Sequence, residues 1–155
     1  MKQINFIYIF IVLLALFSGI PNASASLKQQ GMIKIIRLYS DKNGTSHFQI
    51  KRVPTGNKII PILNIFTTNV FPADGYIIST FNNHFFWDWH IPPQGGQYLD
   101  VILKGRERID ASDGTSKILN AGDILLLEDN SGKGHRAYGL SDGMELTIKL
   151  KHGLM

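Results

Sequence analysis

Hydrophobic residues along this chain occur in short runs that turn-forming residues separate, not in long helical stripes. The last run, over 144–151, alternates strictly between apolar and polar residues. This period of two predicts a strand with one buried face and one solvated face. Asp113-Gly114, between two apolar runs, is a hairpin signal. Many short strands with no helices between them predict an all-β sandwich or barrel.

The same reading gives approximate bounds for each element. We expect strands over residues 32–39, 47–53, 76–81, 85–90, 98–103, 106–111, 116–119, 124–128, 135–138 and 144–151. Residues 54–57 and 72–75 are rich in Pro and Gly, which predicts turns. The run 59–67 contains Pro61 and is expected to be an edge strand or irregular. Lys104-Gly105 predicts a bulge or bend between two strands.

The N-terminus has the features of an export signal. Lys2 precedes 12 uninterrupted apolar residues over 6–17, fewer than the roughly 20 that span a bilayer. Ala23-Ser24-Ala25 then forms a small-x-small cleavage pattern. We expect residues 1–25 to be a signal peptide and residues 26–155 to be one domain, exported to the periplasm or outside the cell with no stable membrane anchor. The alternative is an uncleaved N-terminal anchor.

Composition excludes several classes of protein and site. The chain has no Cys, which excludes disulfides, thiolate zinc sites, iron–sulfur clusters and cysteine nucleophiles. An apolar fraction of 44% with 18% charged residues excludes a disordered chain. The net charge is +4, but the basic residues are scattered and no aromatic residues alternate with them, so we expect no nucleic-acid partner.

The first candidate site lies in the Asp88-Trp89-His90 segment. Residues two apart on a strand point to the same face, so Asp88 and His90 are expected side by side. Together with His135 they would form the two-histidine, one-carboxylate set that holds a divalent metal. Alternatively, Asp88 would orient His90 as a catalytic general base. A third interpretation is a structural hydrogen-bonded pair, with His135 unrelated to it.

These residues belong to a wider pattern. Its parts are Arg37, Tyr39, the segment 44–48 with Ser46-His47-Phe48, Asp88-Trp89-His90, Gln97-Tyr98, and Gly122 through His135 with Glu128-Asp129 inside it. The pattern resembles small single-domain proteins of the cupin superfamily. That resemblance implies a single antiparallel β-barrel of jelly-roll type over 26–155, a small-molecule pocket, a divalent metal ion (Fe, Mn, Ni or Zn) and a homodimer.

The resemblance also indicates further site residues. A metal-ligating Glu of cupins falls near Gln97 or Tyr98, which makes both candidate ligand-binding residues, and Gln97 a weak oxygen donor. His47 is a candidate ligand contact or second base. The alternative for His47, which we favour, is a strand-start histidine bonded to the backbone. Glu128 and Asp129, near Lys133 and Arg136, are expected to form an ion-pair network in their loop. The alternative is that they line the mouth of the barrel.

Two functions remain open at this point. The first is a metal-dependent enzyme acting on a small polar molecule by oxygenation, isomerisation or a similar proton transfer. His90 and Asp88 would then be catalytic, and a metal-free form would use His90 as the base. The second is a non-catalytic cupin that binds a small ligand or a sugar.

Overall fold

The structure, a computed structural model, describes residues 31–60 and 65–151, where the regular elements are strands and one 3₁₀ turn. The elements are β1 (Gly31–Ser40), β2 (Ser46–Thr55), β3 (Asn57–Ile60), β4 (Ile65–Thr67), β5 (Ala73–Phe81), β6 (Phe86–His90), η2 (Pro93–Gly95), β7 (Gln97–Lys104), β8 (Arg106–Ala111), β9 (Ser116–Asn120), β10 (Ile124–Glu128), β11 (His135–Gly139) and β12 (Gly143–Leu150). The all-β prediction is confirmed. The expected signal peptide (1–25) and Pro61 lie outside the described residues. Within the described part, no helix has the length and apolar character needed to cross a membrane.

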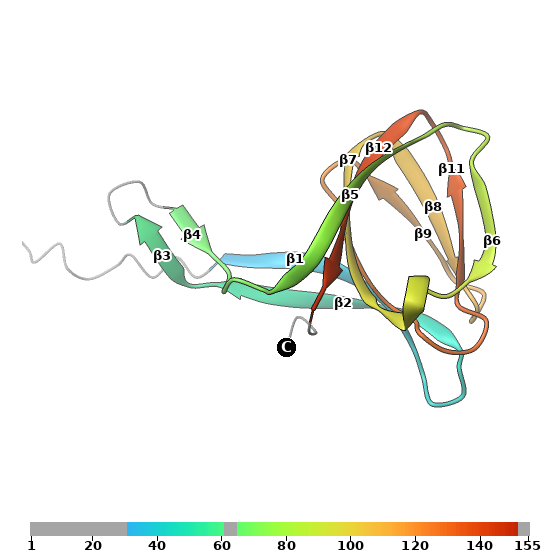
Figure 1. Cartoon of the computed structure of the whole chain (residues 1–155), viewed down its shortest axis with the longest axis horizontal. Helices are drawn as coiled ribbons and strands as arrows, with labels where there is room; N and C mark the ends of the chain where they lie inside the picture. The colour runs from blue at the N-terminus through green and yellow to red at the C-terminus, as the bar shows by residue number, and fades with distance from the viewer. Residues whose placement is uncertain (1–30, 61–64, 152–155) are drawn as a thin grey trace, which may run out of the picture. The chain divides into compact units, whose positions relative to one another are not determined.

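The strands form two large sheets and one small one (Figure 1). The six-stranded sheet has the order β2-β1-β10-β7-β12-β5, the four-stranded sheet has the order β6-β11-β8-β9, and β3 pairs with β4. Among the described residues, strand pairing does not close these sheets into one barrel, and β1 runs parallel to β10. The expectation of a single closed antiparallel barrel is therefore wrong in these two respects. Alternation along a strand indicates its buried face, but not the direction of its neighbour.

The core lies between the two large sheets. Leu38 of β1, Ile102 of β7 and Leu125 of β10 meet Leu119 of β9 from the other sheet, and each is at most 2% exposed. Full burial of such a side chain stabilises the fold by about 1.5–3 kcal/mol, so this cluster holds the sheets face to face. β10 is apolar on both faces, since Leu126 belongs to a second buried cluster on the opposite side of its sheet.

The main departures from the expected bounds occur on edge strands. Pro54 lies inside β2, and residues 73–75 belong to β5, where turns were expected. β2 and β5 are the two outer strands of the six-stranded sheet. An outer strand needs hydrogen-bond donors on one side only, which is why it tolerates a proline that a central strand would exclude.

A bend at Gly105 carries the chain from one sheet to the other. Gly105 lies between β7 and β8 with φ +82°, and a Cβ there would overlap the carbonyl oxygen of Asp142. Both observations require glycine at this position. The predicted bend at Lys104-Gly105 is confirmed. It places β7 and β8, which are consecutive in sequence, on opposite walls of the space between the sheets.

Candidate functional site

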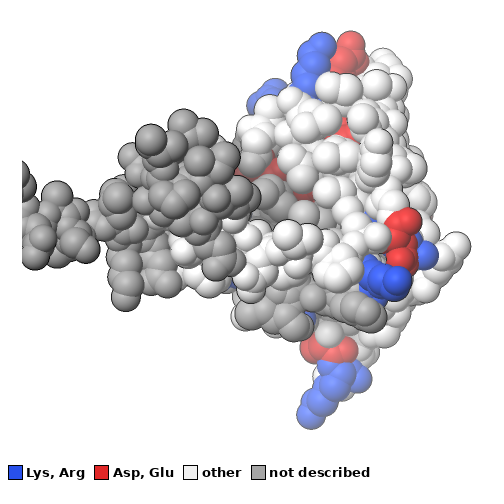
Figure 2. Space-filling model, turned by 60° about the vertical axis from the view of Figure 1, so that its left-hand side comes forward, with Lys and Arg blue, Asp and Glu red and all other residues white. Residues whose placement is uncertain are grey.

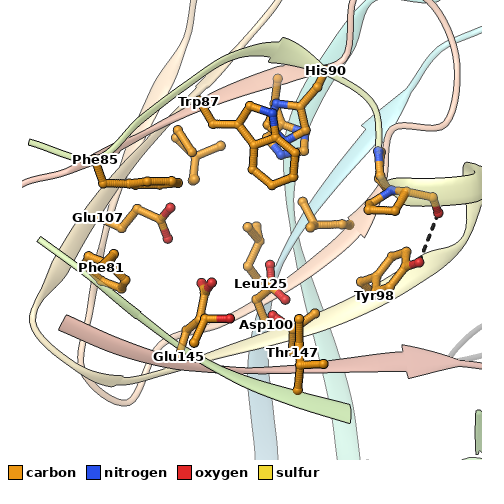
Figure 3. A pocket seen from close by; sticks show the side chains of 18 of the residues that line it. Phe81, Phe85, Trp87, His90, Tyr98, Asp100, Glu107, Leu125, Glu145 and Thr147 are labelled. Carbon is orange, nitrogen blue, oxygen red and sulfur yellow. Dashed lines mark hydrogen bonds between the residues drawn. The ribbon is translucent and has the colours of Figure 1, made fainter. Parts of the chain in front are cut away.

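A cavity of about 300 Å³ lies between the two large sheets. β5, β7 and β12 line it on one side and β6, β8 and β11 on the other (Figure 3). Its volume is at the lower end of the range for small-molecule sites. Much of the lining is apolar or aromatic, but carboxyl groups also reach it, and acidic atoms are visible in a hollow of the surface in Figure 2.

Two histidines stand next to each other in this cavity. His90 at the end of β6 pairs in register with His135 at the start of β11, and their ring centroids are 4.3 Å apart. Gly134 permits the close approach, because a Cβ there would overlap the carbonyl oxygen of His90, and its φ is +71°. The structure thus brings together two of the three predicted metal ligands.

The third, Asp88, lies elsewhere. His135 of β11 pairs with His90 of β6, and Ala137 pairs with Trp87. Between these two pairs β6 has two residues, 88 and 89, where β11 has only Arg136, so β6 carries a bulge. This bulge turns Trp87, not Asp88, to the side of His90, and the two rings stack at 3.8 Å with an 8° angle between their planes. Asp88 is exposed and does not line the cavity. The expectation that Asp88 and His90 share a face is wrong because the bulge interrupts the alternation.

A buried carboxylate fixes the orientation of His135. Its Nδ1 donates a hydrogen bond to Oδ2 of Asp129 over 2.7 Å, and the two residues are 3% and 0% exposed. A carboxylate only accepts, so the proton sits on Nδ1 and the neutral imidazole has an unprotonated Nε2. Because Asp129 occupies the Nδ1 side, Nε2 is the nitrogen available to the cavity.

His90 has the same tautomer for a different reason. Its Nδ1 donates to the backbone carbonyl oxygen of Asp88 over 2.7 Å, which leaves Nε2 unprotonated in the neutral ring. Burial lowers the pKa of His90, and the neighbouring His135 contributes in the same direction. His90 is therefore neutral at pH 7. Asp88 contributes to the site through its backbone carbonyl, which orients His90, and not through its side chain.

Three carboxyl groups from three strands share the cavity: Asp100 of β7, Glu107 of β8 and Glu145 of β12 (Figure 3). Burial raises the pKa of Asp100 to about 6, of Glu145 to about 7 and of Glu107 to about 8. Repulsion within the group adds to this, since Asp100 raises the pKa of both glutamates. A hydrogen bond with Thr147 acts in the opposite direction on Asp100.

Of the candidate ligand-binding residues, the structure places Tyr98 in the cavity but not Gln97 or His47. The phenol of Tyr98 donates to the carbonyl oxygen of Pro93 over 3.0 Å at the edge of the cavity. The Gln97 amide donates to Oε1 of Glu128 over 2.8 Å, on the opposite side of β7. The two neighbours point to different faces because they are consecutive on a strand.

His47 connects two loops at the surface. Its Nδ1 is 2.8 Å from Oδ2 of Asp113, and its Nε2 is 3.3 Å from Oδ2 of Asp41. The hydrogen bond with Asp113, followed by that with Asp41, raises the pKa of His47. Its partners are two carboxylates, not the backbone partner that the sequence favoured, and it does not line the cavity.

The loop acids have partners other than those expected. Glu128 pairs with Arg37 of β1, and Asp129 pairs with His135. Arg136 instead pairs with Asp110 over 3.0 Å. The expected ion-pair network among Glu128, Asp129, Lys133 and Arg136 is therefore wrong: these side chains anchor the loop to neighbouring strands.

The predicted metal set does not assemble. His90 and His135 have the hydrogen-bond partners on Nδ1 that metal ligands commonly have. Asp88, however, points away from them, and over residues 31–60 and 65–151 no three His, Asp or Glu side chains are placed to share one ion. The residues described here thus do not fit the expected two-histidine, one-carboxylate centre, although the histidine pair itself is formed.

Sequence reasoning missed the buried acids. Glu107 is not among the candidate site residues that the sequence offers, and the alternation over 144–151 places Glu145 and Thr147 on the solvated face of the last strand. In the structure all three line the cavity. The alternation of β12 was the available signal, because a polar face is equally compatible with solvent and with an internal cavity.

Comparison with known proteins adds distant structural similarities. No family model and no curated protein matches the chain. A conserved protein of unknown function from Streptococcus pyogenes is 19% identical with a TM-score of 0.42, over 51% of this chain and 65% of that one. A cupin-2 domain protein from Shewanella frigidimarina is 14% identical with a TM-score of 0.41, over 49% and 69%.

A predicted oxalate decarboxylase from Thermotoga maritima is 15% identical with a TM-score of 0.42, over 81% of this chain and 96% of that one.

The raised pKa of Glu107 predicts how stability depends on pH. Its ordinary pKa is 4.5 and its folded value about 8, so the folded protein retains a proton that the unfolded chain loses. The free energy of unfolding should therefore fall as pH rises from about 4.5 to 8. Glu107→Gln should reduce this fall and raise the melting temperature at pH 8.5 by on the order of 5 °C.

Differential scanning calorimetry from pH 5 to pH 8.5 checks this, with the exposed Asp74→Asn variant as control. Equal pH dependence in wild type and Glu107→Gln would show that Glu107 ionises as an ordinary surface glutamate.

Proposed function

We propose that the chain is an exported, cupin-type protein that binds a small molecule between its sheets and moves a proton within it, with His135 as general base. The supporting observation is the buried Asp129–His135 pair beside an open cavity. A carboxylate behind an imidazole holds the tautomer that has a free Nε2 and stabilises the imidazolium that forms when Nε2 takes a proton.

The chemistry that suits this arrangement is an isomerisation at a carbon next to a carbonyl. Nε2 of His135 removes a proton from that carbon, and the electron pair moves into the carbonyl to give an enol or enolate. The imidazolium then returns the proton to the former carbonyl carbon, while the proton of a hydroxyl or amino group on the first carbon passes to the former carbonyl oxygen. The C=O (or C=N) bond thereby moves by one carbon, and no oxidant or reductant is consumed. His90 is neutral and stands against His135, so its Nε2 is positioned as a hydrogen-bond acceptor or a second base.

The second candidate is binding of a small ligand or sugar without catalysis. It is favoured by the aromatic side chains in the cavity, because Phe81, Phe85, Trp87 and Tyr98 offer flat apolar surface of the kind that ligand sites use (Figure 3). The two candidates share the cavity and differ in whether His135 exchanges protons with carbon.

Deuterium exchange distinguishes them. Hydroxyacetone, dihydroxyacetone, aminoacetone and glucosamine are incubated with the protein in D₂O, and loss of C–H signal is followed by proton NMR. We expect protein-dependent exchange in at least one compound. His135→Gln and Asp129→Asn should slow it at least about 100-fold, as expected for loss of a general base.

The exposed His84→Gln is the matched control and should exchange at the wild-type rate. An absence of exchange across the panel would favour the binding candidate. Exchange that disappears on EDTA treatment and returns with Mn²⁺, Zn²⁺, Ni²⁺ or Fe²⁺ would contradict the metal-independent form of the proposal and support a metal at the histidine pair.

Export is a separate part of the proposal, supported by the leader-like sequence of residues 1–25. Intact-mass analysis and N-terminal sequencing of the protein from its native cells should give a chain that begins at Ser26. A chain in the same cells that retains residues 1–25 would contradict cleavage after Ala25.

A further inference from the structure

The carboxyl groups in the cavity lack the partners that buried acids normally have. Glu107 is 6% exposed and lines the cavity, and no described residue forms a hydrogen bond with its carboxyl group. Oδ1 of Asp100 is also buried without a described hydrogen-bond partner. A buried carboxyl without a partner is costly, so its retention in a cavity indicates that something else partners it there.

Among the described residues that line the cavity, no Lys or Arg side chain fills that role. The basic groups among the described lining residues are His90 and His135, and burial lowers the pKa of His90. The Lys and Arg side chains seen in Figure 2 lie on the outside of the molecule. The missing partner is therefore expected to come from a ligand.

The aromatic and acidic residues that line the cavity together indicate which class of ligand it would bind. Glu107 and Glu145 project into the cavity from opposite sheets, with Asp100 close by, while Phe81, Phe85 and Trp87 provide aromatic surface around them (Figure 3). An ammonium group would donate hydrogen bonds to the carboxylates and interact with the aromatic faces. The ionised acids would repel a carboxylate or phosphate ligand, and a neutral sugar has no positive group to pair with them.

A bare divalent cation fits less well than an amine. The described acids and histidines are not grouped so that three of them could ligate one ion. An organic cation needs no such convergence, because each N–H of an ammonium can reach a different acceptor. The apolar remainder of the cavity also calls for a ligand with a hydrophobic body.

We propose that the cavity binds a small organic molecule through a protonated amine, which Glu107 and Glu145 hold with support from Asp100. This inference rests on the cavity being the small-molecule site proposed above, but not on His135 acting as a base.

The pH dependence of binding has a definite sign. The other titratable groups of the cavity are His90 on β6, His135 on β11 and Tyr98 on β7. Asp129 lies behind His135, and the β5 side chains that line the cavity are uncharged. Because the pKa values of the three acids are raised, part of the group is protonated near pH 7 in the empty cavity. Bound ammonium favours the carboxylates, so affinity should rise from pH 6 to pH 8.5 and protons should be released.

The test compares matched probes by isothermal titration calorimetry with the full mature chain. Benzylamine is compared with benzyl alcohol and benzoate. 1-Hexylamine is compared with 1-hexanol and hexanoate. We expect each amine to bind at least tenfold more tightly than its alcohol at pH 8.5, with no measurable binding of the acids. The proton release is measured by repeating the amine titration at pH 7 in buffers that have different ionisation enthalpies.

The variants assign the effect to the acids. Glu107→Gln and Glu145→Gln should each weaken amine binding at least tenfold, leave alcohol binding unchanged and reduce the proton release. Asp74→Asn, exposed on β5, is the control and should bind as wild type. Two glutamate variants are used so that a folding defect in one, detected by circular dichroism, leaves the other informative.

Equal affinity for amine and alcohol, tighter binding of the acid, or failure of both amines to bind at millimolar concentration would overturn the proposal. Wild-type amine affinity in both glutamate variants would also overturn it. Failure of deuterium exchange alone would count against the proton-transfer function and leave the amine site standing.

Discussion

The chemistry of this site depends on three carboxyl groups in a cavity whose described lining contains no Lys or Arg. Moving a carboxylate out of water is costly, and the protein limits that cost by raising the pKa values so that the acids retain protons when the cavity is empty. Glu107, on β8, and Glu145, on β12, come from opposite sheets, so the acids face each other only because the core keeps the sheets in place. A ligand with positive charge, as proposed above, would pair with the carboxylates when they ionise.

The same architecture aligns the histidines with the acids. Gly134 lets β11 approach β6 closely enough to place His135 against His90, and the bulge in β6 stacks Trp87 on His90. Asp129 then fixes one ring and a backbone carbonyl fixes the other, which leaves two unprotonated Nε2 atoms. The acids and the histidines thus lie on different strands that line one cavity.

Much of the fold could be predicted from the sequence, because period-two alternation and Gly- and Asp-rich turns determine strands locally. Sheet order, the parallel β1–β10 pair and the open sheets depend on contacts distant in sequence, which no local pattern encodes. For the site, His90, His135 and Tyr98 were identified and do line the cavity. The bulge in β6 turns Asp88 away from the cavity, and the sequence alone does not show that bulge. Glu107 and Glu145 were not predicted as site residues, because alternation does not distinguish a strand face in water from one that lines a cavity.

The most direct measurement is the ionisation of the glutamates themselves. The chain has three, Glu107, Glu128 and Glu145, so ¹³C labelling of the glutamate carboxyl carbon gives three NMR signals that Gln substitutions assign. The account predicts that, without ligand, Glu107 titrates near pH 8 and Glu145 near pH 7. Titration of both below about pH 5, as for glutamates in water, would contradict it.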